Sequence, residues 1–562
     1  MKAFAAALAL LALAVPGVVG ADATQLGIGY ICGAERNPTQ KATQAVMLTG
    51  VGNGASPADT TNREAQAWFN EGLNLYHAFN HNEANAAFAK AASLDPNCAL
   101  CEWGVALGLG PTLNYGVTAD QTALALTHAQ KAARLVKPGD TRAAALTAAL
   151  LVRYDKDKAD RDTLYAKAMD ALAVRYPADD EIADLTAQAL MLPTRGSNAA
   201  NNARAIELIK TVLARKPDDT AAIHYYIHAT EFVDRPADAL PYAEKLAGLA
   251  PGASHLVHMA AHTLMHVGQY EQVAIVDAEA LKVDSDTEKR LAYAGPLSAQ
   301  MYYLHNYTFG LAGALMAGDA KLALKYADHA DVAFPAGDKT PVALPAGLTR
   351  NESAPDRRAT AIAKSMVAYG RYDPARALKL TDQPGDIRLV KIYRHYARGE
   401  AFAARGDAAG VNAEAAAVAA LSAEAKTAGE FGNVSLADIA TGVLHGRAAL
   451  LEHQPAKAAE LFAAAATRQE KTYPANKNFD PPPWWYPVRR SLAAADLAAG
   501  KPADAVREAQ ASLKDWPDDA LALKVLSEAE AKQGHAAEAA KAMAQAKRVW
   551  HGDLAKVSLD VV

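Results

Sequence analysis

Residues 64–96 read EAQAWFNEGLNLYHAFNHNEANAAFAKAASLDP. Small, aromatic and helix-ending residues occupy fixed places in this stretch, namely Trp68, Gly72, Ala84, Phe88, Ala91 and Pro96. A small residue in one helix lets a second helix cross close to it, and Pro cannot continue a helix because its ring removes the N–H donor. The stretch therefore predicts a packed pair of helices that ends at Pro96.

The same spacing recurs far along the chain, in Gly446, Ala458, Phe462 and Ala465. Pro217 and Pro251 are 34 residues apart, and so are Gly500 and Gly534. A period of about 34 residues is typical of tetratricopeptide repeats (TPRs), in which helix pairs stack into a solenoid. We therefore predict an all-α, TPR-like helix-pair solenoid with a right-handed superhelix, rather than a helical bundle with coincidental Gly and Pro.

The N-terminus has the features of a signal peptide, which we assign to residues 1–23. Lys2 precedes an apolar run from Ala3 to Val15, and Pro16 and Gly17 break it. Small residues follow, so we expect cleavage near residues 20–23 and a periplasmic or secreted protein. A membrane-spanning helix needs about 20 consecutive apolar residues. No later segment is that long, so we expect no membrane span.

Composition divides the rest of the chain into four parts. Residues 24–60 are rich in Gly and Thr and form an N-terminal extension, and residues 61–335 form an N-terminal TPR-like array. Residues 336–358 are rich in Pro and Gly and predict a linker, and residues 359–562 form a C-terminal TPR-like array. The net charge is −5, and the sequence has no basic stripe. We therefore expect no nucleic-acid partner.

Histidines are concentrated in one region. Of the 16 His in the chain, seven lie between residues 224 and 305. His224 and His228 are one helical turn apart, and so are His258 and His262. Each member of the first pair lies 34 residues before its counterpart in the second. We therefore expect the pairs on the first helices of consecutive repeats, where they face the concave groove and converge on one point.

Neutral imidazole is a common ligand of copper and zinc. Four imidazoles would close a tetrahedral zinc site, and three plus water would leave an open position. Our leading hypothesis is a transition-metal site, holding copper or zinc, made by His224, His228, His258 and His262. Further candidates for the site or the groove are His255, His305, Glu231 and His81.

Other functions remain open on this pattern. The groove could instead hold a peptide or an envelope protein, or respond to protons, because free imidazoles titrate near neutral pH. An open three-His site could serve a metal-dependent oxidoreductase. Tyr225 stands where a metalloprotease helix carries its general-base Glu, so we do not infer hydrolysis and lean away from an enzyme.

Cys98 and Cys101 form a CxxC pattern that leads from the turn at Pro96 into the next helix. We favour a structural disulfide, with a redox or copper-linked role and simple packing as alternatives. Cys32 is the third Cys and could pair with either.

Several motifs resemble a family of bacterial exported TPR proteins that carry HxxxH and HxxHxxxH elements in consecutive repeats. The matching positions are Phe79, Asn80, Glu83, Ala84, Gly110, Pro111, Asn114, His224, His228, His255, His258, His262 and His305. Where that family often has Met-Pro-Ser-His, this chain has Met259-Ala260-Ala261-His262. The resemblance implies a helical solenoid and a site at these His, and it assigns no reaction.

Overall fold

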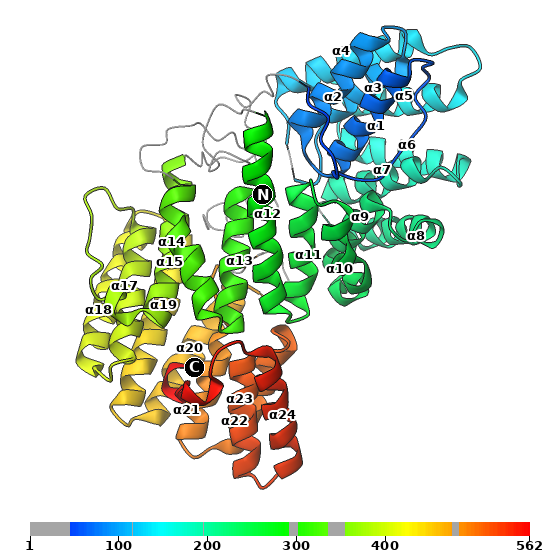
Figure 1. Ribbon diagram of the computed structural model, residues 1–562. Helices are drawn as coiled ribbons and strands as arrows, with labels where there is room; N and C mark the ends of the chain where they lie inside the picture. Colours follow the sequence, from blue (N-terminus) through cyan, green and yellow to red (C-terminus); the bar gives the residue numbers. More distant parts are fainter. Residues whose placement is uncertain are drawn as a thin grey trace, which may run out of the picture.

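The computed structural model describes residues 45–114, 116–194, 196–291, 302–334, 354–474, 481 and 483–562. Within these ranges the regular structure is helical, without a β-strand, and each helix packs mainly on the next one along the chain. The prediction of an all-α solenoid of TPR-like helix pairs is confirmed. Figure 1 shows α11 to α14 lying between the N-terminal helices α1 to α10 and the C-terminal helices α15 to α24.

The N-terminal helices are α1 Arg63–His77, α2 His81–Leu94, α3 Ala99–Gly108, α4 Ala119–Leu135, α5 Thr141–Tyr154, α6 Arg161–Arg175, α7 Asp180–Met191, α8 Ala199–Arg215, α9 Thr220–Phe232 and α10 Leu240–Leu249. The central helices are α11 Ser254–His266, α12 Tyr270–Leu291, α13 Tyr303–Ala317 and α14 Ala320–Ala333. The C-terminal helices are α15 Ala354–Tyr372, α16 Pro374–Ala377, α17 Arg388–Ala403, α18 Ala408–Thr427, α19 Phe431–Leu451, α20 Pro455–Thr472, α21 Val488–Ala498, α22 Pro502–Asp515, α23 Ala520–Lys532 and α24 Ala536–Val549.

The first repeat shows why the sequence pattern works. A Cβ atom placed on Gly72 of α1 would lie 2.5 Å from a ring carbon of Phe88 on α2, and one on Gly104 of α3 would lie 2.4 Å from the same ring. The Phe88 ring therefore sits between three helices and holds successive repeats together. A Cβ atom placed on Gly446 of α19 would likewise lie 2.6 Å from a ring carbon of Phe462 on α20.

Two hydrophobic cores meet inside α11. The N-terminal core contains residues from Leu48 to Met259 together with Leu291 and Tyr302, whereas the core that continues into the C-terminal helices begins at Ala260 and reaches Trp516. Every residue of α11 from Ser254 to Met265 is buried. This helix is therefore packed on more than one side, unlike a helix whose polar face lines an open groove.

The structure describes only part of the predicted segments. The proposed signal peptide lies outside the described residues, and so does most of the proposed linker. Helix α15 begins at Ala354, ahead of residue 359 where the second array was expected, and it packs on α14. The second hydrophobic core includes residues from both sides of the linker. The two predicted arrays therefore share a core, and α14 and α15 are in direct contact.

Residues 45–60 of the extension lie against the first repeats. The Leu48 N–H donates to Glu71 Oε1 at 2.6 Å, and the Asn53 side chain contacts Thr220 at 3.1 Å. The Gly252 N–H donates to the Gly50 carbonyl at 2.7 Å. The extension thus connects α1 with the starts of α9 and α11, which are far apart in sequence.

Helix α19 is the one helix in the described part of the chain that is long and apolar enough to cross a membrane. In the structure, 67% of its most apolar window is buried, and it packs between α18 and α20. The helix therefore has the surroundings of a core helix.

We predict that Gly72→Ala lowers the free energy of unfolding by about 1–3 kcal/mol, because the new methyl group overpacks the Phe88 ring. The matched control is Gly248→Ala in α10, where a Cβ meets nothing within 4 Å. That change should be neutral or stabilising by up to about 1 kcal/mol, since Ala favours helix over Gly. Thermal unfolding of both variants measures this, and equal effects at the two positions would contradict the packing argument.

Candidate metal centre

Helices α9, α11 and α13 carry the clustered histidines. Asp219 begins α9 by accepting hydrogen bonds from the N–H groups of Ala221 and Ala222, both at 3.1 Å. The α9 segment places His224 and His228 one turn apart, and α13 begins at Tyr303, two residues before His305. The six imidazoles that the helices bring together form two groups of three.

The first group contains His224, His228 and His255, which we call the first His group. His224 Nε2 lies 3.1 Å from His228 Nε2 and 3.1 Å from His255 Nε2. The Phe79 ring packs over all three, with its centroid 4.5 Å from that of His224. The Tyr302 ring stacks on His255 at 4.1 Å. Aromatic rings therefore enclose this group.

The second group contains His258, His262 and His305, which we call the second His group. His262 Nε2 and His305 Nε2 are 3.4 Å apart, and the ring centroids of His258 and His305 are 4.6 Å apart. Phe309 packs against all three, at 4.9 to 5.0 Å. His305 is partly exposed, whereas the other five histidines of the two groups are buried. The second group is thus the one that reaches toward solvent.

Hydrogen bonds at Nδ1 orient three of the six rings. His224 Nδ1 lies 2.6 Å from the His77 carbonyl oxygen, and His258 Nδ1 lies 2.6 Å from Asp277 Oδ1. His262 Nδ1 lies 2.9 Å from Glu231 Oε1. Carbonyl and carboxylate oxygens accept, so each Nδ1 donates and the Nε2 of a neutral ring keeps its lone pair. Metal-binding histidines are usually held in this way.

Burial keeps these rings neutral. Burial, and to a smaller extent the proximity of other imidazoles, lowers the pKa of His224 to about 3. The same causes hold the pKa values of His228, His255 and His258 well below the usual value. Ligand nitrogens must be deprotonated to bind a metal ion. The first His group therefore offers lone pairs at neutral pH without losing protons first.

The four predicted ligands do not form one site. His224 and His228 join His255, and His258 and His262 join His305. The direct contact between α9 and α11 pairs His224 with His255, 31 residues later, instead of with its repeat equivalent 34 residues later. Three residues correspond to about 4.5 Å along a helix. His258 is therefore displaced along α11 and faces His305 of α13.

The expected open groove lined by these histidines is not what the structure shows, because the side chains are buried. His224, His228, His255, His258 and His262 are each no more than 2% exposed. They lie between helices because α11 is packed by α9, α12 and α13. These five histidines thus form an internal layer rather than a lining of the concave surface.

The secondary candidates take different places. Glu231 contacts Nδ1 of His262, and its Oε1 is 3.6 Å from His266 Nε2. Glu231 therefore orients the His262 ring through Nδ1 and leaves Nε2 facing His305. His81 lies outside both groups, with its Nε2 3.3 Å from Thr112 Oγ1. Its ring is close to that of Phe79, at 5.7 Å between centroids. His81 therefore borders the aromatic enclosure of the first His group.

Asp277 and the His77 carbonyl were not anticipated from the sequence. Asp277 is wholly buried on α12, among Val273, Ala274 and Ala280, which are also buried there. A charged residue on an apolar helical face is a signal that could have singled out Asp277. The His77 carbonyl is a backbone atom brought in from α1, and no sequence pattern marks it.

Cys98 and Cys101 are joined in a disulfide at the start of α3, and both are buried. The Cys98 sulfur accepts from the Cys101 N–H at 3.0 Å, so it also caps the helix. The structure therefore has the pairing that we favoured from the CxxC pattern. Cys32 lies outside the described residues.

No protein-family model and no curated protein matches this chain. Among solved structures, one similar chain is from the human IFIT1 dimer with m7Gppp-AAAA, with 12% identity over 76% of this chain and 87% of that chain and a TM-score of 0.32. Another is from the structure of Naa15/Naa10 bound to HypK-THB, with 14% identity over 86% of this chain and 70% of that chain and a TM-score of 0.22. These likenesses are loose, and the helix-pair fold is established by the chain's own geometry.

We predict that Asp284→Asn stabilises the protein at high pH only. Asp284 lies on α12 beside Asn306, 3.3 Å from its side-chain nitrogen, and burial raises its pKa from 3.8 to about 7. The folded state binds this proton more tightly than the unfolded state, so stability falls as pH rises from about 4 to about 7. Asn avoids the buried charge and should add on the order of 2–4 kcal/mol at pH 8 and little near pH 4.

Thermal unfolding at the two pH values measures the effect. Asp286→Asn is the matched control, because Asp286 is on the same helix with 54% of its side chain exposed. An equal gain from Asp284→Asn at both pH values would contradict the raised pKa.

Proposed function

We propose that this chain is an extracytoplasmic TPR-like protein that binds transition metal ions, copper or zinc, in its two His groups. The observation that carries the proposal is the separation of the ligand nitrogens. Nε2 atoms lie 3.1 Å apart in the first His group and 3.4 Å apart in the second. Two ligands of a tetrahedral ion lie about 3.3–3.4 Å apart, because each bond is about 2.0–2.1 Å long.

The orientation of the rings supports the same conclusion. The Nε2 of His224 faces two other imidazole nitrogens in a buried place, and the Nε2 of His258 has no hydrogen-bond partner in the described part of the chain. Buried polar atoms without partners are destabilising by about 1–3 kcal/mol each. A bound cation would satisfy these lone pairs together. The extracytoplasmic location rests on the signal-peptide pattern of residues 1–23.

The two groups differ in the acidic side chains near them. Burial raises the pKa of Asp277 well above its usual value, and a bound cation would favour its ionised form. In the described part of the chain no carboxylate contacts His224, His228 or His255, whereas Asp277 and Glu231 contact the second His group. The cost of burying an ion rises with the square of its charge, so a divalent ion costs roughly four times as much as a monovalent one. The first His group therefore suits Cu(I), and the second suits a divalent ion such as Zn(II).

Metal content of the protein tests the proposal. Apoprotein titrated with Cu(I) and Zn(II) together should take up about two ions per chain, one for each three-His group. His224→Ala should remove one ion and His258→Ala the other, with helicity by circular dichroism unchanged. His535→Ala, at a side chain that is 54% exposed, should leave the content unchanged. Absence of bound metal at micromolar concentrations would overturn the proposal.

Asp277→Asn tests the role of the buried carboxylate. The substitution keeps the shape of the side chain but removes the ionisable carboxyl group that contacts His258 Nδ1. We predict that it weakens metal binding at the second His group by about 10–100-fold, as is typical for partners of metal-binding histidines. Binding of Cu(I) to the first group should stay the same, and an equal loss at both groups would point to a general structural defect instead.

A further inference from the structure

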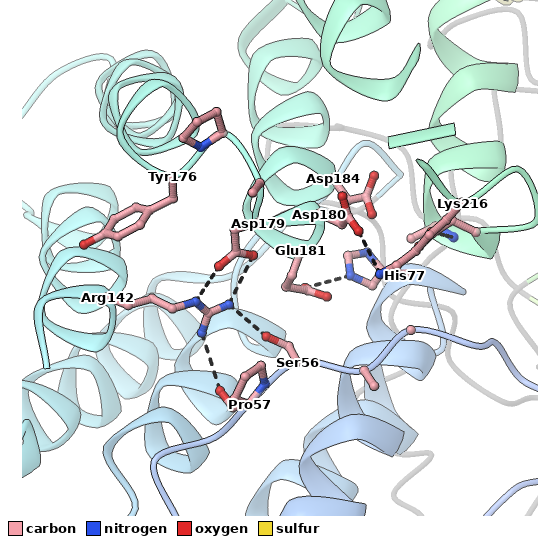
Figure 2. Close-up of a pocket in the computed structure, with 16 residues that line it drawn as sticks. Ser56, Pro57, His77, Arg142, Tyr176, Asp179, Asp180, Glu181, Asp184 and Lys216 are labelled. Carbon is pink, nitrogen blue, oxygen red and sulfur yellow. Dashed lines mark hydrogen bonds and ion pairs between the residues drawn. The ribbon is translucent and has the colours of Figure 1, made fainter. Parts of the chain in front are cut away.

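A cavity of about 500 Å³ lies beside the first His group and is not used by it. Residues 54–57 of the extension, the start of α7 and the start of α9 line it, as Figure 2 shows. His77 belongs to its wall, while the carbonyl of the same residue holds His224. Ligand pockets typically have volumes of about 300–1,000 Å³, so the cavity is large enough for a small molecule.

Two carboxylates at the cavity are balanced by cations. Asp179 Oδ2 lies 2.6 Å from Arg142 Nε, and Asp180 Oδ2 lies 2.7 Å from Lys216 Nζ. Both pairs are visible in Figure 2. Neither carboxylate therefore needs a ligand.

Two further carboxylates also have partners inside the protein. Glu181 Oε1 lies 2.9 Å from His77 Nε2. Asp219 accepts from two N–H groups at the start of α9. Their positions are thus explained by the fold.

Asp184 is the exception among the acidic residues of this cavity. It lines the cavity and is 2% exposed, and its Oδ1 is buried without a hydrogen-bond partner. No ion pair or hydrogen bond to its side chain exists in the described part of the chain, and no dashed line reaches it in Figure 2. A buried carboxyl group without a partner is destabilising, so its presence points to a partner from outside.

The surroundings of Asp184 are negative. Burial, followed by the charges of Asp219, Glu181 and Asp180, raises its pKa well above the usual value, while Lys216 opposes this. A cation that enters the cavity would be attracted by this potential. Tyr176, Pro177 and Pro57 add apolar surface to the lining of the cavity.

We propose that this cavity binds a small organic cation with a primary alkylammonium group, which Asp184 holds as its counter-ion. A primary ammonium is compact and has three donors, so it can reach Oδ1 of Asp184 and other oxygens while its alkyl chain lies on the apolar wall. A metal ion fits less well, because neither of the two metal-like groups in the described residues contains Asp184. The ammonium could belong to a free diamine or to the side chain of a lysine in a peptide.

Calorimetric titration of the full-length protein with 1,4-diaminobutane, and separately with N-acetyl-lysine amide, tests the proposal. Either compound should bind and raise the thermal midpoint. Asp184→Asn keeps the shape and should weaken binding by at least about tenfold, since a charged hydrogen bond is lost. The matched control is Asp218→Asn, at a carboxylate that is 59% exposed and does not line the cavity.

The stability of the variant separates loss of binding from loss of fold. Asp184→Asn replaces a buried carboxyl group whose Oδ1 has no hydrogen-bond partner in the described part of the chain, so the ligand-free thermal midpoint of the variant should equal or exceed that of the wild type. Preference for one compound identifies the source of the ammonium group. The proposal is overturned if neither compound binds, or if Asp184→Asn binds them as tightly as the wild type.

Discussion

Helix α11 has almost no exposed surface, and the centre of the molecule depends on how its buried histidines are partnered. An imidazole can be buried without a large penalty only if its polar nitrogens find partners. His258 finds Asp277 of α12, and His262 finds Glu231 of α9. These contacts come from one helix before α11 and one after it in the sequence, so α11 fixes the relative positions of the repeats on either side of it.

The same layer joins the two hydrophobic cores. Met259 belongs to the N-terminal core and Ala260 to the next. Phe79 covers the first His group and Phe309 the second. In each group the imidazole nitrogens face one another and aromatic rings surround them. In such a low-dielectric setting, a difference in nearby charge between the two groups has a large effect. The position of Asp277 and Glu231 beside only one group is therefore the main chemical difference between them.

The sequence was informative where a local pattern has one physical meaning. Gly72 and Phe88 predicted a close helix crossing, and the Phe88 ring occupies that crossing. The two i,i+4 His pairs identified the helices that carry the groups, and His255 and His305 were recognised as neighbours. The sequence was less informative about which rings meet, because a repeat period fixes equivalent places in each repeat and leaves open how far one helix is displaced along the next.

By itself, the sequence determined the helix-pair solenoid and the region that holds the histidines. These follow from periodicity and side-chain chemistry, which act over one or two helical turns. Only the tertiary structure decided that six imidazoles form two groups, that they are buried, and that Asp277 and the His77 carbonyl orient them. It also decided that Asp184 faces a cavity without a partner. Such contacts join α1, α7, α9, α11 and α12, and the spacing of residues along a chain does not fix distances between helices that are far apart in sequence.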